Sequence, residues 1–270
     1  MKQILLSGGG GPIHTKKLDA LFASLISPIL PVLVIKIIDE NSDLNIQPRL
    51  NSLKAFGEVL RKKLRRPKLT LAGFRSALAV VKTIISPRWA EESRYRKSFS
   101  SVGIKEFTLW TNLRNKNKND LKLYGGIYID GGNTFEIQKS LQESGFDKEI
   151  IRFANRGGIV YGKCAGANVL GYDTLSSQLY NDDYVEVHDK LGLRLFRDYS
   201  IFSNYSNFAK DKLSRISKSA NKPVLALEPK TCLYLRGSKV SIVGKGRVYE
   251  FNPTMRQLPK EFEIANRSSV

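Results

Sequence analysis

The chain has 270 residues, 41% of them hydrophobic, which is enough for the core of one large α/β domain or two small ones. Its 44 Lys and Arg outnumber its 25 Asp and Glu, and the resulting net charge of +19 favours association with anionic partners without indicating a fold. Two cysteines and two histidines are too few for a disulfide framework or a cysteine-rich zinc site, so we expect no structural metal and no cofactor.

The first 38 residues have the pattern of a β-α-β unit. Residues 2–7 form a short apolar strand that ends in a glycine run, Gly8 to Gly11, before a helical spacing at 15–26 and a strand at 32–38. The glycine run favours a tight turn near the mouth of a site over a phosphate cradle, because no Gly-x-Gly-x-x-Gly accompanies it. The glycine run also stands where the apolar region of a signal peptide would have to continue. No apolar run reaches the roughly 20 residues that span a bilayer, so we predict a cytoplasmic protein.

The basic residues are concentrated between residues 54 and 98. Thirteen Lys and Arg stand there against three Glu, in a mostly helical pattern over about residues 50–98 that indicates an insertion or a helical cap. A solvated helical face is the favoured interpretation, because charge runs are usually exposed. A basic lid that attracts an acidic substrate or another anionic partner comes second. Nucleic-acid binding comes third, because no recognised nucleic-acid-binding fold appears.

The pattern of strands and helices resumes after the basic block. The predicted elements are strands at 104–110, 124–129 and 159–161, with helices at 135–144 and 148–155. Several short strands separated by glycine turns follow. We therefore predict one α/β domain over residues 1–252, with a three-layer, mostly parallel sheet flanked by helices. Residues 253–270 lack apolar periodicity and are predicted to form a loose tail.

The sequence Gly162-Lys163-Cys164-Ala165-Gly166 follows a predicted strand and is typical of a nucleophile elbow. Glycines two positions before and after a nucleophile allow the sharp, strained turn that presents its side chain above a sheet. The start of the following helix favours the thiolate form of a cysteine. The N–H of Ala165 would supply half of an oxyanion hole, and Gly131 or Gly132 the other half. The alternative is a structural cysteine buried in a tight turn.

Two motifs in this region resemble those of the peptidase E family, which also contains cyanophycinase. They are YIDGGNTF, residues 128–135, and GGIVYGKCAGAN, residues 157–168. Shorter similarities at 191–193 and 244–249 extend the resemblance to most of the chain except the basic block. It implies a class I glutamine amidotransferase-like (flavodoxin-like) fold. The activity it implies is hydrolysis of peptide bonds next to acidic residues by a serine, with a histidine as base.

The chain departs from that family at two positions. Cys164 stands where the family has its nucleophilic serine, although amidotransferases of the same fold also use a cysteine. Asn204 aligns with the family's catalytic histidine, and an amide accepts no proton near neutral pH. The family's own route to a general base is therefore in doubt for this chain.

His188 is the candidate replacement for the missing base. It lies beside Asp182 and Asp183, candidate acidic partners that could orient an imidazole, in a loop where the family carries an acidic catalytic residue. A solvated histidine in an exposed polar loop is the simpler interpretation. The same holds for His14, which follows the glycine run.

Three functions remain open from these residues. The leading hypothesis is a peptidase E-like hydrolase that cleaves a peptide or small amide substrate with Cys164 as nucleophile. The resemblance implies that the cleaved bond lies next to an acidic residue. The competing hypothesis is a binding or regulatory protein that kept the fold, lost the base and uses the basic block to hold an anionic partner. The third is acyl or amide transfer through a Cys164 thioester.

Overall fold

The computed structural model describes residues 1–10, 12–38 and 87–264. The chain divides into two compact units, one comprising residues 1–37 and 99–270 and the other residues 38–98. The first unit carries both sheets and the elbow. It therefore contains the candidate site.

Most of the described part of the second unit, residues 87–98, lies in helix α4 (Pro87–Ser100). Within it Arg94 pairs with Glu91 and Arg96 with Glu92, so part of the basic charge is balanced locally. The rest of the predicted insertion lies outside the described residues. Its function as a helical face, a lid or a binding surface stays a prediction. No helix in the described part of the chain is long and apolar enough to cross a bilayer.

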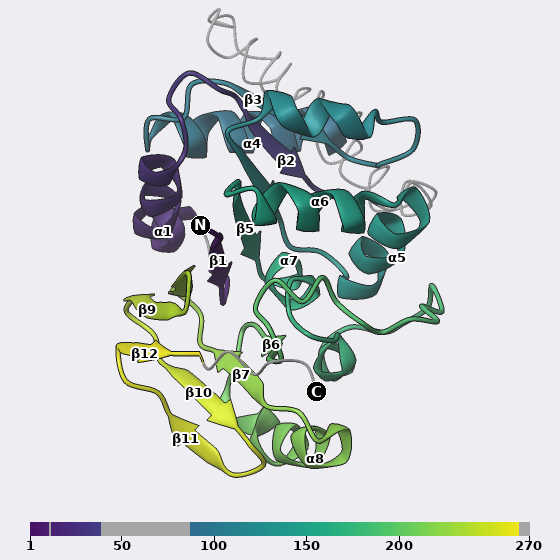
Figure 1. The fold of residues 1–270 in the computed structure, drawn as a ribbon, viewed down its shortest axis with the longest axis vertical. Helices are drawn as coiled ribbons and strands as arrows, with labels where there is room; N and C mark the ends of the chain where they lie inside the picture. The colour runs from purple at the N-terminus through teal and green to yellow at the C-terminus, as the bar shows by residue number, and fades with distance from the viewer. Residues whose placement is uncertain (11, 39–86, 265–270) are drawn as a thin grey trace, which may run out of the picture. The chain divides into compact units, whose positions relative to one another are not determined.

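The larger sheet contains eight strands: β1 (Gln3–Ser7), β2 (Val32–Ile35), β3 (Phe107–Trp110), β4 (Gly126–Ile129), β5 (Ile159–Lys163), β8 (Thr231–Arg236), β9 (Lys239–Gly244) and β12 (Glu261–Glu263). Their order is β12-β9-β8-β1-β5-β4-β2-β3 (Figure 1). The strands from β1 to β3 in this order are parallel, and β8, β9 and β12 extend the sheet in antiparallel fashion. The carboxyl ends of β1, β4 and β5 consequently meet at one edge, where ligands bind in open α/β sheets.

The parallel strands are apolar along their length because both faces of this part of the sheet are covered. All four residues of β2 and all four of β4 are buried. On one face, Phe22 of α1 (Pro12–Leu25) packs against Tyr128 and Tyr161, with ring centroids 6.0 and 5.4 Å apart. Successive side chains of a strand point to opposite faces. The neighbours of these tyrosines therefore point toward the other helical layer.

That second layer consists of α5 (Thr134–Ser144), α6 (Phe146–Asn155) and the short α7 (Ala165–Val169). Ile129 and Val160 belong to the same core cluster as Ile137 of α5 and Ile150 of α6. Gly145, with φ 70°, ends α5 and begins α6, so the two helices follow each other without a longer loop. A largely parallel sheet between helical layers confirms the predicted α/β class.

A smaller sheet of four strands was not anticipated as a separate layer. It contains β6 (Ser200–Phe202), β7 (Val224–Leu227), β10 (Val248–Phe251) and β11 (Met255–Gln257), in the order β11-β10-β7-β6. Its own core joins Phe202, Tyr205 and Phe251 with Leu213 of α8 (Lys210–Ala220). The remaining helical turns are η2 (Lys118–Leu123), η3 (Leu175–Leu179) and η4 (Asn207–Ala209).

The described end of the chain differs from the predicted loose tail. Strand β11 pairs with β10, and β12 pairs with β9 at the edge of the larger sheet. Leu258 and Ile264, which flank β12, are buried in the core. These strands are only three residues long, which is too short for apolar alternation to be visible in the sequence. Residues 265–270 lie outside the description.

Candidate active site

Cys164 lies in a sharp turn between β5 and α7. Its backbone has φ 51° and ψ −121°, a conformation that side-chain-bearing residues rarely adopt and that costs on the order of 1–3 kcal/mol. A Cβ on Gly162 would come within 2.5 Å of the Gly166 carbonyl oxygen, and one on Gly166 within 2.1 Å of the Ile129 carbonyl oxygen. Neither glycine position has room for a side chain. The turn therefore has the geometry expected of a nucleophile elbow.

The partly exposed Cys164 side chain lies where three loops converge. A Cβ on Gly9, in the loop after β1, would be 2.3 Å from Cys164 Sγ. One on Gly131, after β4, would be 2.9 Å from Cys164 Cβ. Asn204, after β6, donates a hydrogen bond from Nδ2 to Sγ at 3.4 Å. The glycine run, whose last residue Gly11 is outside the description, thus reaches the nucleophile position itself.

The predicted oxyanion donors are backbone N–H groups of Ala165 and of Gly131 or Gly132. Ala165 occupies the first turn of α7, where N–H groups have no partner within the helix. The Lys36 ammonium group donates to the Gly131 carbonyl oxygen and lies 4.0 Å from Asp130 Oδ2. In a trans peptide the C=O and the following N–H point in opposite directions, so this contact also fixes the direction of the Gly132 N–H.

Asn204 is held beside the sulfur through its backbone. Its N–H donates to the Gly8 carbonyl at 3.0 Å, and its own carbonyl accepts from the Tyr180 hydroxyl at 3.1 Å. Its φ of 56° is in the left-handed region, which Asn tolerates better than most residues. The side chain presents a hydrogen-bond donor to the sulfur. An amide nitrogen cannot accept the thiol proton, so Asn204 is no substitute for a histidine base.

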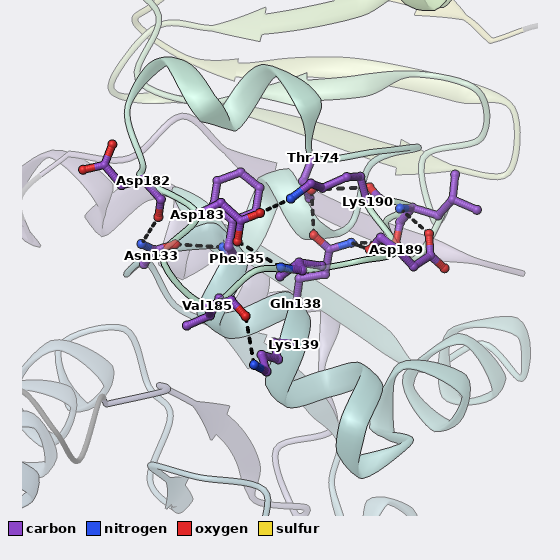
Figure 2. A network of polar contacts seen from close by, with 12 residues as sticks. Asn133, Phe135, Gln138, Lys139, Thr174, Asp182, Asp183, Val185, Asp189 and Lys190 are labelled. Carbon is purple, nitrogen blue, oxygen red and sulfur yellow. Dashed lines mark hydrogen bonds and ion pairs between the residues drawn. The ribbon is translucent and has the colours of Figure 1, made fainter.

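The loop of residues 181–191 is fastened to α5 through its backbone carbonyls (Figure 2). The contacts are Asn133 Nδ2 to Asp182 O at 2.9 Å, Gln138 Nε2 to Asp189 O at 2.7 Å and to Leu191 O at 2.9 Å, and Lys139 Nζ to Val185 O at 2.8 Å. Gln138 is 1% exposed, and its Oε1 accepts from the Thr174 hydroxyl at 2.6 Å. These contacts with residues 133–139 use the loop's carbonyls rather than its acidic side chains.

The two candidate acidic partners have different environments. The Asp183 carboxylate pairs with Lys190 and accepts from the Val187 N–H at 3.1 Å. Burial alone would raise the pKa of Asp183, but these hydrogen bonds and the Lys190 charge outweigh it and leave the pKa below its ordinary value. The Asp182 side chain is exposed. Asp183 therefore stabilises the loop, and Asp182 is the carboxylate left for another partner.

Among the described side chains, no histidine is hydrogen-bonded to the nucleophile. His188 is exposed, and no hydrogen bond joins its imidazole to Cys164. His14 lies in α1, and its side chain is outside the described part. The assignment of His188 as base stays a prediction. Among the described residues no group of three or more His, Cys, Asp or Glu side chains is arranged to hold a metal ion.

The face of β5 toward α1 carries buried polar groups. Lys163 is 7% exposed, and Asp19 is 2% exposed and accepts a hydrogen bond from the Thr15 hydroxyl at 3.1 Å. Burial raises the pKa of Asp19, against the effect of the nearby Lys163 charge. Burial also raises the pKa of the fully buried Cys232 thiol far above its usual range. Cys232 is therefore a protonated, inaccessible internal control for the reactivity of Cys164.

The family assignment follows from a match over the region that builds this site. The model of peptidase family S51 matches residues 84–243, which include the elbow, the Gly131 loop and Asn204. The chain belongs to peptidase family S51. This confirms the resemblance to peptidase E and supports a peptidase-like hydrolase. No curated protein sequence matches this S51 chain.

Two solved structures share the fold of this S51 chain. A peptidase from an acI-B1 Actinobacterium is 16% identical with a TM-score of 0.61, over 98% of this chain and 97% of that protein. A protein assigned to peptidase E from Listeria monocytogenes EGD-e is 17% identical with a TM-score of 0.58, over 91% of this chain and 99% of that protein. They confirm the class I glutamine amidotransferase-like architecture expected from the resemblance.

Two residues of the S51 site were not identified from the sequence. Lys36 directly follows the buried strand β2, and a polar residue at the carboxyl end of a parallel strand is a signal that could have identified it. Tyr180 reaches the site through a hydrogen bond to the Asn204 carbonyl. No local pattern marks Tyr180, because its contact depends on how β6 and the turn after η3 pack together.

Proposed function

We propose that this S51 chain is a hydrolase that cleaves a peptide or small amide bond with Cys164 as its nucleophile. The observation that carries the proposal is the strained turn at Cys164, φ 51°, which presents a partly exposed side chain beside Gly9 and Gly131. Such strain persists only where surrounding contacts enforce it, and it clusters at active sites. Membership of S51 supports the peptidase class of the reaction.

In the proposed reaction the Cys164 sulfur attacks the substrate carbonyl carbon, and the thiol proton ends on the leaving amine. The N–H groups of Ala165 and of Gly131 or Gly132 would bind the oxyanion of the tetrahedral intermediate. Its collapse breaks the C–N bond, releases the amine and leaves a thioester on Cys164. Water then adds to the thioester carbonyl, and the C–S bond breaks to release a carboxylic acid and restore the thiol.

Asn204 would act in this reaction as a hydrogen-bond donor that stabilises negative charge on the sulfur. His188 is the proposed base for the water step, with Asp182 as its acidic partner because Asp183 is engaged by Lys190. This role requires the exposed imidazole to approach the thioester. His188→Ala should then lower kcat by about 10²-fold, the usual contribution of a general base. An unchanged kcat would remove His188 from the mechanism.

Lys36 is the cation that would bind an acidic substrate at this edge of the sheet. Lys36 is 20% exposed and contacts the Gly131 loop, where a substrate carboxylate could lie. The basic block at 54–98 is proposed to attract the same acidic substrates at longer range. Lys36→Ala should raise KM for Asp-containing peptides more than for neutral ones, because it removes a charge from binding.

A binding or regulatory function is the second candidate, and Asn204 is the observation that favours it. A chain that has lost its base could keep the elbow and hold an acyl compound or an anionic partner without turnover. The third candidate is acyl transfer from the Cys164 thioester to an amine. In an assay of dipeptide hydrolysis it would appear as product whose formation depends on added amine.

The decisive experiment measures hydrolysis of Asp-containing dipeptides by the full-length protein and its variants. Cys164→Ala should abolish turnover, and Asn204→His should increase it by supplying an imidazole beside the sulfur. Limiting iodoacetamide should label Cys164 before the buried Cys232. If Cys164→Ala hydrolyses the dipeptides as fast as the wild type, the proposed function is wrong. Labelling of Cys164 without hydrolysis in any variant would favour the binding protein.

A further inference from the structure

Two exposed aromatic side chains contact each other on the described part of the chain. The aromatic residues among its exposed large apolar side chains are Tyr180, Tyr184 and Phe208, with 43%, 59% and 61% of their surfaces exposed. Tyr180 and Phe208 contact each other, with ring centroids 5.5 Å apart and planes at 69°. Single exposed apolar residues need no explanation, but a contacting aromatic pair creates a local apolar surface.

The pair is held in a fixed arrangement by the core beneath it. Tyr180 stacks on Phe202 with centroids 4.8 Å apart and planes at 15°, and Phe202 is fully buried in the smaller sheet. The Tyr180 hydroxyl is fixed at its other end by the Asn204 carbonyl. Tyr180 and Phe208 therefore form an exposed aromatic surface, called here the aromatic corner. Its Tyr180 ring is held in place by the buried Phe202 beneath it. A rigid aromatic surface loses little conformational entropy when it binds a ligand.

This aromatic corner is connected to the nucleophile through one residue. Tyr180 contacts the Asn204 backbone at 3.1 Å, and the Asn204 side chain contacts Cys164 Sγ at 3.4 Å. These two contacts and the Asn204 residue between them separate the sulfur from the corner, and a few residues of an extended peptide, at about 3.3–3.6 Å each, would cover that path. A substrate bound at Cys164 would thus bring a neighbouring side chain to Tyr180 and Phe208.

We propose that Tyr180 and Phe208 form a subsite for a large apolar or aromatic side chain of the substrate. The inference rests on the proposed function. It adds that the substrate carries a large apolar or aromatic residue near the cleaved bond. Asn204 binds Gly8 beyond β1, whereas Gly131 follows β4, and β5 with Cys164 lies between these two strands in the sheet. The apolar side chain therefore binds on the β1 side of Cys164, and the Lys36 side remains for an acidic group.

The first test compares two peptides that differ only in having Phe or Ala next to the cleaved bond. The wild type should cleave the Phe peptide with a kcat/KM at least about 10-fold higher, as expected when an apolar pocket takes up a larger side chain. Phe208→Ala should remove that preference. Tyr184→Ala is the matched control, because Tyr184 is equally exposed and has no ring contact with the pair. Equal cleavage of both peptides by the wild type would overturn the subsite.

The second test does not require hydrolysis and so separates the two proposals. The rate of Cys164 alkylation is measured with N-benzyl iodoacetamide and with N-methyl iodoacetamide, which share their reactive group. The benzyl reagent should react several-fold faster in the wild type and in Tyr184→Ala, but not in Phe208→Ala. Loss of hydrolysis with a retained benzyl preference would sink the proposed function alone. Equal rates in the wild type would sink the subsite alone, and no labelling of Cys164 would contradict both.

Discussion

The turn around Cys164 and the loop of residues 181–191 lie in the same S51 unit, but different contacts hold them. The turn is enclosed by backbone, since Gly162 and Gly166 leave no room for a Cβ against neighbouring carbonyl oxygens. The loop is held by side chains of α5 and of its N-cap Asn133, which donate to the loop's carbonyls (Figure 2). A side chain at Gly162 or Gly166 would clash with backbone atoms, so neither glycine can be replaced without a large loss of stability. Removing one side-chain donor from the loop removes only that hydrogen bond and leaves the others in place.

This difference has a functional meaning for the proposed hydrolase. The nucleophile must be presented in one strained geometry, which backbone packing enforces. The loop carries Asp182 and His188 on its exposed side, and its attachment through separate hydrogen bonds allows it to be loosened without unfolding the sheet.

The largest effect is expected at the elbow. Gly166→Ala would place a Cβ 2.1 Å from the Ile129 carbonyl oxygen and should lower the free energy of unfolding by about 3 kcal/mol or more. Gly103→Ala is the control, because no atom lies within 4 Å of its Cβ position and only its φ of 91° is unfavourable, at a cost of about 1 kcal/mol. Urea denaturation followed by circular dichroism measures both. Equal losses would show that backbone enclosure does not distinguish the elbow.

A smaller effect is expected at the buried contact of the loop. Gln138→Leu removes the donor to the Asp189 and Leu191 carbonyls and leaves the Thr174 hydroxyl without Gln138 Oε1, so it should cost about 2 kcal/mol. Gln142→Leu removes an exposed donor to the same carbonyls and should cost about 0.5 kcal/mol. Hydrogen exchange of residues 181–191 should quicken in the first variant with the sheet still protected. Global loss of protection would contradict the contrast between loop and elbow.

The smallest effect is a pH dependence within the loop. The pKa of Asp183 is lowered in the folded state, so its contribution to stability is present above the ordinary carboxyl pKa and is lost as pH falls through the lowered value. The wild type should therefore lose loop protection below about pH 4, by under about 1 kcal/mol because the pair is partly solvated. Asp183→Asn should lack this dependence. A variant with an unchanged pH profile would show that Lys190 does not stabilise the loop through this carboxylate.

Several parts of the candidate site could be predicted because short sequence patterns specify them. The spacing of Gly162, Cys164 and Gly166 after an apolar strand predicted the strained turn, since a backbone without room for a Cβ demands glycine whatever surrounds it. The alignment with the family's histidine singled out Asn204, whose side chain contacts the sulfur in the structure. The end of the chain was predicted wrongly, because β11 and β12 are stabilised by pairing with distant strands rather than by their own pattern.

By itself the sequence determined the α/β class, the family and the position of the elbow, because apolar periodicity, family motifs and glycine spacing are local features of the chain. Only the tertiary structure decided what surrounds Cys164. Gly9 and Lys36 follow parallel strands of the larger sheet, whose carboxyl ends converge at one edge. Asn204 follows β6 of the smaller sheet and is held beside Cys164 by the hydrogen bond from its N–H to the Gly8 carbonyl. The aromatic corner beside Asn204 likewise exists only once the smaller sheet has packed Phe202 beneath Tyr180.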